Sequence, residues 1–175
     1  MGRARRTYRF CPRCGAALAY LRRPGDRRER PVCSGCGYVF YQHSRVAVGG
    51  LVERDGRVLL ARRRYAPYRG WWDVPGGFLE EGEHPEDGIR RELREETGLT
   101  VRPVRLLAIL MDRAAYDGVT YYLLNLFYAL EVVGGGEPQP ADDVTELRWF
   151  SRAELPDRVA FRSCREVVRR WRQGT

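Results

Sequence analysis

The chain has no lysine, so all 31 of its basic side chains are arginines. It also has no run of the roughly 18 apolar residues that a membrane-spanning helix requires, and no hydrophobic signal segment separates its arginine-rich start from Cys11. These absences argue against a membrane partner or a secretory signal, and they predict a cytoplasmic protein. Because disulfides are uncommon in such a reducing compartment, the cysteines are expected to bind metal instead.

The size and charge of the chain set its general class. Its 175 residues, 43% of them hydrophobic, are enough for one well-buried domain with a small appended module. A net charge of +8 favours anionic partners such as nucleotides, pyrophosphates or nucleic acid. An arginine-only composition is explained equally well by codon bias, so the charge narrows the ligand class only weakly.

Four of the five cysteines have the spacing C-x2-C-x18-C-x2-C, which is typical of a four-thiolate zinc site. They are Cys11, Cys14, Cys33 and Cys36. A closed shell of four thiolates leaves no open coordination position, so this zinc is predicted to be structural. A module of about 35 residues cannot build a sufficient core alone, and the metal should supply much of its folding free energy.

The segment between the two cysteine pairs is predicted to form a hairpin around a Pro24-Gly25-Asp26 turn. Arginines from Arg22 to Arg30 would allow it to bind nucleic acid. They alternate with acidic residues, however, which is more typical of a solvated face. The fifth cysteine, Cys164, is interpreted as a small core residue of the last helix.

From position 45 onward the sequence predicts strands and helices mixed without βαβ regularity. Strand-like runs, VAVGGLVE and VLLARR, flank an Asp55-Gly56 turn. A helix is predicted from Pro85 to Thr97, followed by two longer strands, a further strand at LRWF and an arginine-rich helix near 161–172. This order favours an α/β sandwich with a mixed sheet. We expect a zinc ribbon at residues 1–44 and the main domain at residues 45–175.

Three glutamates crowd one turn of the predicted helix. Glu92, Glu95 and Glu96 have the spacing i, i+3 and i+4, which places like charges on one side. The helix dipole at its C-terminal end disfavours anions further. Such crowding is explained if divalent cations bind there, because magnesium prefers carboxylate oxygens and bridges them to substrate phosphates. The alternative is a solvated acidic patch balanced by neighbouring arginines.

The sequence from Gly77, GFLEEGEHPEDGIRRELREETGL, matches every defined position of the pattern G-x5-E-x7-R-E-U-x-E-E-x-G-U, where U is aliphatic. This stretch resembles the Nudix box, the signature of the Nudix hydrolases, and the resemblance extends from about Val46 to Trp171. The four-cysteine segment before it is similar to the ribbon of one subset of that family. The resemblance implies a Nudix α/β/α sandwich with a mixed sheet, preceded by a small zinc-ribbon module.

The resemblance also implies a catalytic role for the glutamates. By motif position, Glu92 and Glu96 would be the principal ligands of Mg²⁺ or Mn²⁺, with Glu95 as a further ligand or as general base. The main-chain carbonyl of Gly76 would add an oxygen. In Nudix families the general base varies and can lie on a downstream loop. The acidic residues available there are Glu137, Asp142, Asp143 and Glu146, of which Asp143 and Glu146 are the better candidates.

Two further residues of the box are expected to act through geometry. The resemblance implies that Arg91 and Glu83 pair with each other and hold the helix against the preceding loop. Their loss would then reduce activity through misplacement of the glutamates.

The reaction implied by the resemblance is metal-dependent hydrolysis of a pyrophosphate bond in a nucleoside diphosphate linked to another moiety, such as ADP-ribose or FAD. Trp71 and Trp72 are candidates to stack on a base, although burial in the core explains them equally well. Arg62, Arg63 and Arg64 are candidates to bind phosphate oxygens. The expected partner is a nucleotide or dinucleotide rather than a nucleic acid, with a second copy of the chain as a further partner, since Nudix relatives are often dimers.

Three alternatives stay open from the sequence. One is a house-cleaning nucleoside triphosphate pyrophosphohydrolase. Another is an NADH pyrophosphatase, but those enzymes carry the motif S-Q-P-W-P-F-P-x-S after the box, where this chain has LMDRAAYDG. The third is a non-catalytic protein that senses a nucleotide or binds nucleic acid, against which the complete set of box glutamates argues.

Overall fold

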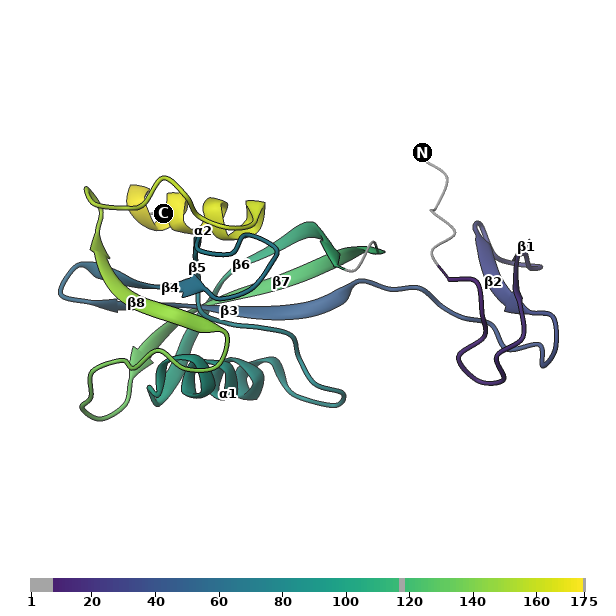
Figure 1. Cartoon of the computed structure of the whole chain (residues 1–175), viewed down its shortest axis with the longest axis horizontal. Coiled ribbons are helices and arrows are strands. Elements are labelled where there is room, and N and C mark those ends of the chain that lie inside the picture. Colours follow the sequence, from purple (N-terminus) through teal and green to yellow (C-terminus); the bar gives the residue numbers. More distant parts are fainter. Residues whose placement is uncertain (1–7, 117–118, 175) are drawn as a thin grey trace.

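The computed structural model describes residues 8–116 and 119–174, and within them the main domain forms one six-stranded mixed sheet with a helix on each face (Figure 1). The strands of this sheet are β3 (Arg45–Arg54), β4 (Arg57–Arg63), β5 (Trp72–Asp73), β6 (Val101–Tyr116), β7 (Val119–Val132) and β8 (Val144–Ser151). Their order is β5-β4-β3-β7-β6, with β8 also paired to β4. Strands β3 and β7 are parallel and the other pairs are antiparallel, so the predicted α/β sandwich is confirmed.

Helix α1 (Pro85–Thr97) covers one face of the sheet and α2 (Arg162–Gln173) covers the other (Figure 1). Strand β4 lies between them and is buried on both faces. Its Leu59 packs into the cluster under α1, which includes Leu93. Its Leu60 packs into the cluster under α2, which includes Trp171. Burial on both faces explains why VLLA is a continuous apolar run rather than an alternating one. In the described residues, both helices are too short and too polar for a membrane span.

Helix α1 begins and ends where the sequence predicts. His84 precedes it, and its Nδ1 accepts a hydrogen bond from the Glu86 N–H at 3.3 Å. Pro85 takes the first turn, where its missing N–H is not needed. At the other end Gly98 adopts a left-handed φ of 71°, and its N–H donates to the carbonyl of Arg94.

Strand β3 allows α1 to approach because it has a glycine at the point of contact. A Cβ atom on Gly50 would lie 2.2 Å from Leu130 Cδ1 and 3.2 Å from Leu93 Cδ2. A larger residue would force the side chains of Leu130 and Leu93 to move within the packed core. This close approach brings the helix, and the glutamates on it, to the loop that follows β5.

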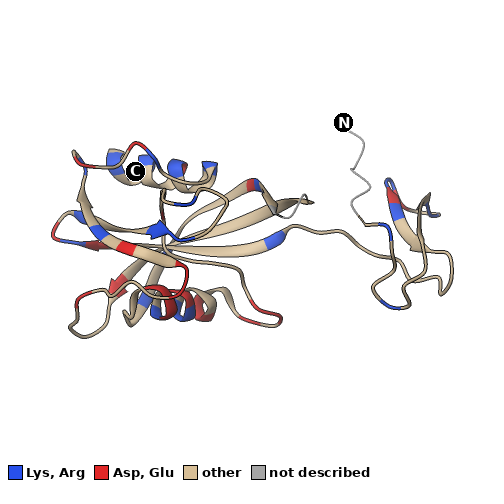
Figure 2. Ribbon diagram, in the orientation of Figure 1, with Lys and Arg blue, Asp and Glu red and all other residues tan. Residues whose placement is uncertain are grey.

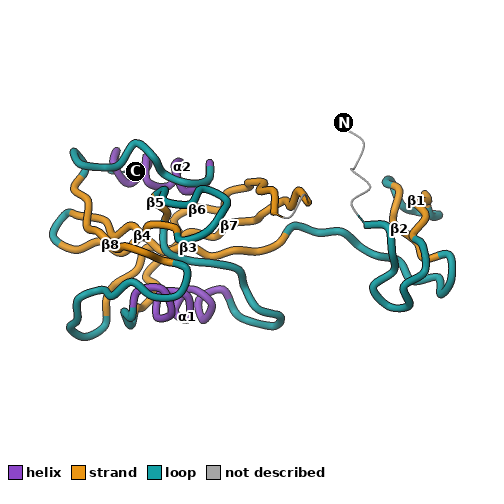
Figure 3. Tube along the Cα trace, viewed as in Figure 1, coloured by secondary structure: helices purple, strands orange, loops and turns teal. Residues whose placement is uncertain are grey.

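The zinc module is a two-stranded hairpin that lies apart from the main sheet (Figure 3). Strand β1 (Leu18–Arg22) pairs antiparallel with β2 (Glu29–Cys33) across the turn that contains Pro24, as the sequence predicts. The segment from residue 40 to residue 44 then leads from this module to β3.

Two features of the sheet were not predicted. The short strand β5 lies between the run VLLARR and helix α1, where no strand was predicted, and its Trp72 and Asp73 pair with β4. Strand β6 continues beyond the predicted run VRPVRLLAIL as far as Tyr116, and its Pro103 lies beside a register shift against β7. Proline is tolerated there because β6 is an edge strand, where one row of backbone N–H groups has no ladder partner.

A Gly88→Ala substitution is expected to destabilise the protein although alanine is the better helix former. A Cβ atom there would lie 2.3 Å from Leu79 Cδ2 and 3.0 Å from Glu83 Oε2, and Glu83 is held in place by Arg91. Overpacking costs about 1–3 kcal/mol, which outweighs the gain in helix propensity of about 1 kcal/mol. We expect the free energy of unfolding in urea to fall by about 1 kcal/mol.

The matched control is Gly135→Ala, because no heavy atom lies within 4 Å of a Cβ built there. That variant should unfold at the parent's urea concentration or slightly above it. A Gly88→Ala protein more stable than the parent would contradict the close approach of the loop to the helix.

Candidate functional site

The loop after β5 is held against β3 by backbone hydrogen bonds. Val48 N–H donates to the carbonyl of Gly77, and Gly50 N–H donates to that of Pro75, both at 2.9 Å. Gly76 has a φ of 146°, and a Cβ atom on it would lie 2.1 Å from the Val48 carbonyl oxygen. A Cβ atom on Gly77 would be only 2.5 Å from a carboxylate oxygen of Glu92 on α1. The two glycines therefore let the loop pass between β3 and the helix.

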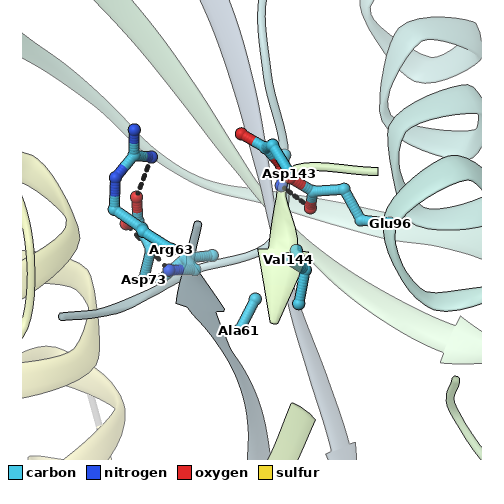
Figure 4. Close-up of a pocket in the computed structure, with 8 residues that line it drawn as sticks. Ala61, Arg63, Asp73, Glu96, Asp143 and Val144 are labelled. Atoms are coloured by element: carbon cyan, nitrogen blue, oxygen red, sulfur yellow. Dashed lines mark hydrogen bonds and ion pairs between the residues drawn. The ribbon is translucent and has the colours of Figure 1, made fainter. Parts of the chain in front are cut away.

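Glu96 is the most deeply buried acid of the box. Its side chain is 6% exposed, and its Oε2 accepts a hydrogen bond from the Gly76 N–H at 2.8 Å. Asp143, from the loop before β8, faces the same carboxyl (Figure 4). Burial raises the pKa of Glu96 well above its ordinary value, and the charge of Asp143 raises it further. Within the described residues neither acid forms an ion pair, so this negative charge has no cationic partner from the protein.

Glu92 and Glu95 have different surroundings. Burial raises the pKa of Glu92, while the adjacent Arg91 acts in the opposite direction. The side chain of Glu95 is 47% exposed and points its carboxylate to the same arginine. The three glutamates thus lie along one side of α1 at increasing exposure from Glu96 through Glu92 to Glu95. Figure 2 shows the acidic residues gathered on this helix.

Arg91 donates five hydrogen bonds, of which three connect the helix to the loop and two stay within the helix. Its Nε and Nη2 donate to the two carboxylate oxygens of Glu83 at 2.8 and 2.9 Å, and Nη2 also donates to the Phe78 carbonyl. Its Nη1 donates to Glu92 at 2.8 Å and to Glu95 at 3.0 Å. The fork on Glu83 lowers the pKa of that carboxyl to about 2. The expected pair of Arg91 and Glu83 is present, and it fixes the loop on α1.

The chemistry of this donor set fits a divalent cation. The guanidinium of Arg91 stands between Glu92 and Glu95, and Glu96 with Asp143 provides further carboxylate oxygens at a site largely removed from water. Within the described residues, only the four cysteines, and no group of carboxylates, bring their ligand atoms within 4.8 Å of one another. An ion at the glutamates would thus draw the carboxylates closer together than they lie beside Arg91.

Two of the other acids that the sequence offered as general bases are engaged elsewhere. Glu146 pairs with Arg62 at 3.0 Å, and Glu137 pairs with Arg54 at the same distance. Asp143 is the candidate that the fold brings to Glu96.

The residues predicted to contact substrate have different surroundings in the structure. Arg62 donates to the Gly70 carbonyl as well as to Glu146, and Arg64 donates to the carbonyl of Val144 at the edge of the site. Trp72 packs its ring edge to face on the core residue Phe150, with centroids 4.8 Å apart. Trp71 instead stands in the loop beside Tyr68, with centroids 5.2 Å apart. The core interpretation therefore explains Trp72, whereas a base-stacking role for Trp71 stays a prediction.

Asp73 is a charged residue at the site that the sequence did not indicate, whereas its partner Arg63 was, like the arginine on either side of it, a candidate to bind phosphate oxygens. A small pocket lies between Glu96 with Asp143 on one side and Arg63 with Asp73 on the other (Figure 4). Arg63 and Asp73 form an ion pair of 3.0 Å, and burial raises the pKa of Asp73 despite that pair. Asp73 also contacts the thiol of Cys164, which is buried as predicted. No motif marks Arg63 or Asp73, because their proximity depends on the pairing of β4 with β5.

The second metal centre is formed by the cysteines of the ribbon. All four sulfur atoms lie within 4.8 Å of one another, with Cys11 and Cys36 at 3.8 Å and Cys14 and Cys33 at 3.4 Å. A tetrahedron with zinc–sulfur bonds of about 2.3 Å has edges of about 3.8 Å, so the donor set fits zinc. Hydrogen bonds led by the Cys36 N–H lower the pKa of the Cys33 thiol to about 6. The pKa of Cys14 is instead raised to about 12, because the lowering effect of the Ala16 backbone is outweighed by hydrogen bonds with the other thiols. Zinc requires all four sulfurs as thiolates, so its binding would release protons.

Glu96→Gln should stabilise the metal-free protein at neutral pH. Because the pKa of the buried carboxyl is raised above its ordinary value of 4.5, its ionisation lowers stability as the pH rises above that value. Glutamine keeps the acceptor for Gly76 without the charge. We expect thermal unfolding with a magnesium and manganese chelator to shift upward by a few degrees, about 2–4 °C per kcal/mol. The control is substitution of the exposed Glu95 by glutamine, which should leave the unfolding temperature unchanged. A lower unfolding temperature for Glu96→Gln would contradict the claim that ionised Glu96 destabilises the metal-free protein.

Loss of zinc should unfold the ribbon and leave the main domain folded. With Cys33→Ser, the two-dimensional NMR signals of residues 8–44 are expected to collapse toward the unfolded range, while those of the main core persist, because the hairpin has too small a core of its own. The control is Cys164→Ser, which leaves the four-sulfur set intact. A zinc-free ribbon that keeps its dispersed signals would show that the metal does not hold the fold.

Two family models match consecutive parts of the chain. The model described as NUDIX domain matches residues 43–171, and the one described as Nudix N-terminal, a zinc ribbon, matches residues 9–42. The chain is also similar to an ADP-ribose pyrophosphatase of Methanocaldococcus jannaschii, with 34% identity over 78% of this chain and 80% of that protein. It is 33% identical to an NAD-capped RNA hydrolase NudC of Stutzerimonas stutzeri over 85% of this chain, which spans 50% of that relative.

A similar arrangement occurs in a solved structure. The crystal structure of a NUDIX hydrolase from Nitrosomonas europaea superposes with a TM-score of 0.82 at 29% identity, over 95% of this chain and 91% of that one. The chain therefore belongs to the Nudix hydrolase family and carries that family's N-terminal zinc ribbon.

Proposed function

We propose that this protein hydrolyses the pyrophosphate bond of a nucleoside diphosphate linked to a second moiety, such as ADP-ribose, FAD or a similar dinucleotide. The observation that carries the proposal is the buried carboxylate of Glu96 beside Asp143, held by the glycine loop on the box helix without a cation from the protein. The similar proteins named ADP-ribose pyrophosphatase and NAD-capped RNA hydrolase act on substrates of this class by name, which supports the choice.

We assign the divalent ion, Mg²⁺ or Mn²⁺, to Glu92 and Glu96, with Glu95 and the Gly76 carbonyl as further oxygen donors. When bound, the ion neutralises the diphosphate and makes a water molecule more acidic. The box helix then positions the ligands, because Arg91 and Glu83 fix it on the loop. Arg91 would have to release Glu92 or Glu95 when the ion binds.

We assign the proton acceptor to Asp143. A water oxygen attacks one phosphorus, the bond from that phosphorus to the bridging oxygen breaks, and the proton of the water passes to a carboxylate. Asp143 faces the Glu96 carboxyl and forms no ion pair within the described residues, whereas Glu146 is held by Arg62. Glu95 remains the alternative, but its carboxylate is bonded to Arg91.

The remaining parts of the assignment follow from the organisation of the chain. We place the catalytic domain at residues 45–175, the ribbon at residues 1–44, and the protein in the cytoplasm, where the thiolates of the ribbon stay reduced. Exposed apolar side chains on the edge strand β6, including Ile109 and Met111, support a dimer with a second copy of the chain.

The products distinguish the proposed reaction from its main rival. With Mg²⁺ or Mn²⁺, ADP-ribose should give AMP and ribose 5-phosphate, and FAD should give AMP and FMN, as separated by anion-exchange chromatography. A nucleoside triphosphate pyrophosphohydrolase would instead release pyrophosphate from ATP. Turnover of nucleoside triphosphates with none of ADP-ribose, FAD or NADH would contradict the proposed substrate class.

Glu92→Gln should lower kcat/KM by at least about a hundredfold, since it removes a ligand of the ion. Asp143→Asn should lower kcat about a hundredfold or more with little change in KM, because it removes the proton acceptor and not the binding site. The control is Glu81→Gln, an exposed acid within the box at a position that its pattern leaves free. Equal activity of the Asp143→Asn and Glu81→Gln proteins would exclude Asp143 as general base.

A further inference from the structure

The positive charge of the chain lies in its first 44 residues. These residues contain ten arginines and two acidic residues, whereas residues 45–175 contain 21 arginines and 21 acidic residues. The whole net charge of +8 therefore belongs to the ribbon and its leading segment. Zinc with four thiolates subtracts two charges and leaves this part strongly positive. The domain that handles the small substrate has no net charge with which to attract anions.

The arginines of the ribbon are available to a ligand. Six of the seven arginines in residues 8–44 are exposed, namely Arg9, Arg13, Arg22, Arg23, Arg27 and Arg28. Arg30 is the exception, and it is also the only arginine of that range with an ion pair among the described residues, to Asp26. Four of the exposed arginines lie at the tip of the hairpin, at the end of β1 or in the turn before β2. Such a cluster costs self-repulsion unless an anion binds there.

Aromatic rings of the first 44 residues are also exposed. Phe10 is 68% exposed and Tyr41 is 54% exposed, although the small core of the module is short of apolar side chains. The guanidinium of Arg30 lies 5.3 Å from the centre of the Tyr41 ring, so one face of that ring already makes a cation–π contact. Leu21 pairs with Arg30 across the hairpin and adds an exposed apolar surface beside it.

We propose that the zinc ribbon binds single-stranded nucleic acid. Exposed arginines that track a phosphate backbone, interleaved with aromatic rings on which unpaired bases stack, are the two elements of sequence-tolerant single-strand recognition. The described part of the ribbon has no helix to enter a major groove. The bases of a fully paired duplex stack on one another, so they are not available to the exposed rings. The site is separate from the box and goes beyond the proposed hydrolysis of a small substrate.

This inference reverses the expectation that nucleic acid is not a partner. That expectation relied on the alternation of arginine with acids from Arg22 to Arg30. Both acids of the ribbon, Asp26 and Glu29, lie within that short run. Elsewhere in the first 44 residues there are arginines and no acids, so the balance of charge within the run is not that of the module. Asp26 forms an ion pair with Arg30 and therefore does not neutralise the exposed arginines.

The test is fluorescence anisotropy of a short labelled single-stranded RNA with the full-length, zinc-loaded protein at several salt concentrations. We expect binding that weakens steeply between about 50 and 200 mM salt. Arg27→Ser with Arg28→Ser should weaken binding and reduce the slope of log affinity against log salt by about 0.7 for each lost phosphate contact. Tyr41→Ala should weaken binding about tenfold with little change in that slope.

Matched controls lie on the main domain. Arg158→Ser with Arg162→Ser removes the same charge from two exposed positions, and Tyr122→Ala removes an equally exposed ring. Zinc content shows that each ribbon variant is folded, and small-substrate turnover, measured in parallel, tests the proposed hydrolysis separately. The proposal is overturned if single-stranded RNA does not bind, if the control variants weaken binding as much as the ribbon variants, or if duplex RNA or phosphatidylserine vesicles bind at least as tightly through the same residues.

Discussion

A carboxylate held away from water without a cation from the protein is the constraint on which the site depends. Glu96 can occupy that position because Gly76 donates its N–H to it and because the loop passes close to β3. The same loop crosses the carboxylate of Glu92 at a distance that only glycine permits. Burial and the neighbouring Asp143 make ionisation of Glu96 unfavourable. A divalent ion bound there, as we propose, would offset that penalty by balancing the negative charge.

Electrostatics divide the chain into two parts with different tasks. In the main domain, Arg91 pairs with three acids of the box and balances part of their negative charge. In the described part of the ribbon, the six exposed arginines form no ion pair, and the aromatic side chains of Phe10 and Tyr41 are exposed as well. A single net charge for the chain conceals this division, since the acids and arginines of the main domain cancel.

Local signals in the sequence predicted the elements that depend on neighbouring residues. Pro85 and Gly98 bound the box helix, and the cysteine spacing predicted the four-sulfur centre. Contacts between distant segments were not predictable in the same way. Asp73 and Arg63 meet only because β5 pairs with β4, and Asp143 reaches Glu96 only because β8 follows on the other side of β4. The relation of Trp72 to the core is likewise a consequence of that pairing.

Binding of Mn²⁺ to the zinc-loaded protein, followed by electron paramagnetic resonance in the absence of any nucleotide, tests most directly whether the crowded carboxylates exist to hold an ion. The parent protein should bind Mn²⁺, and replacement of both Glu92 and Glu96 by glutamine should weaken that binding by at least about tenfold while the zinc content is unchanged. Equal Mn²⁺ affinity in the parent and the double variant would contradict the assignment of these two carboxylates to the metal.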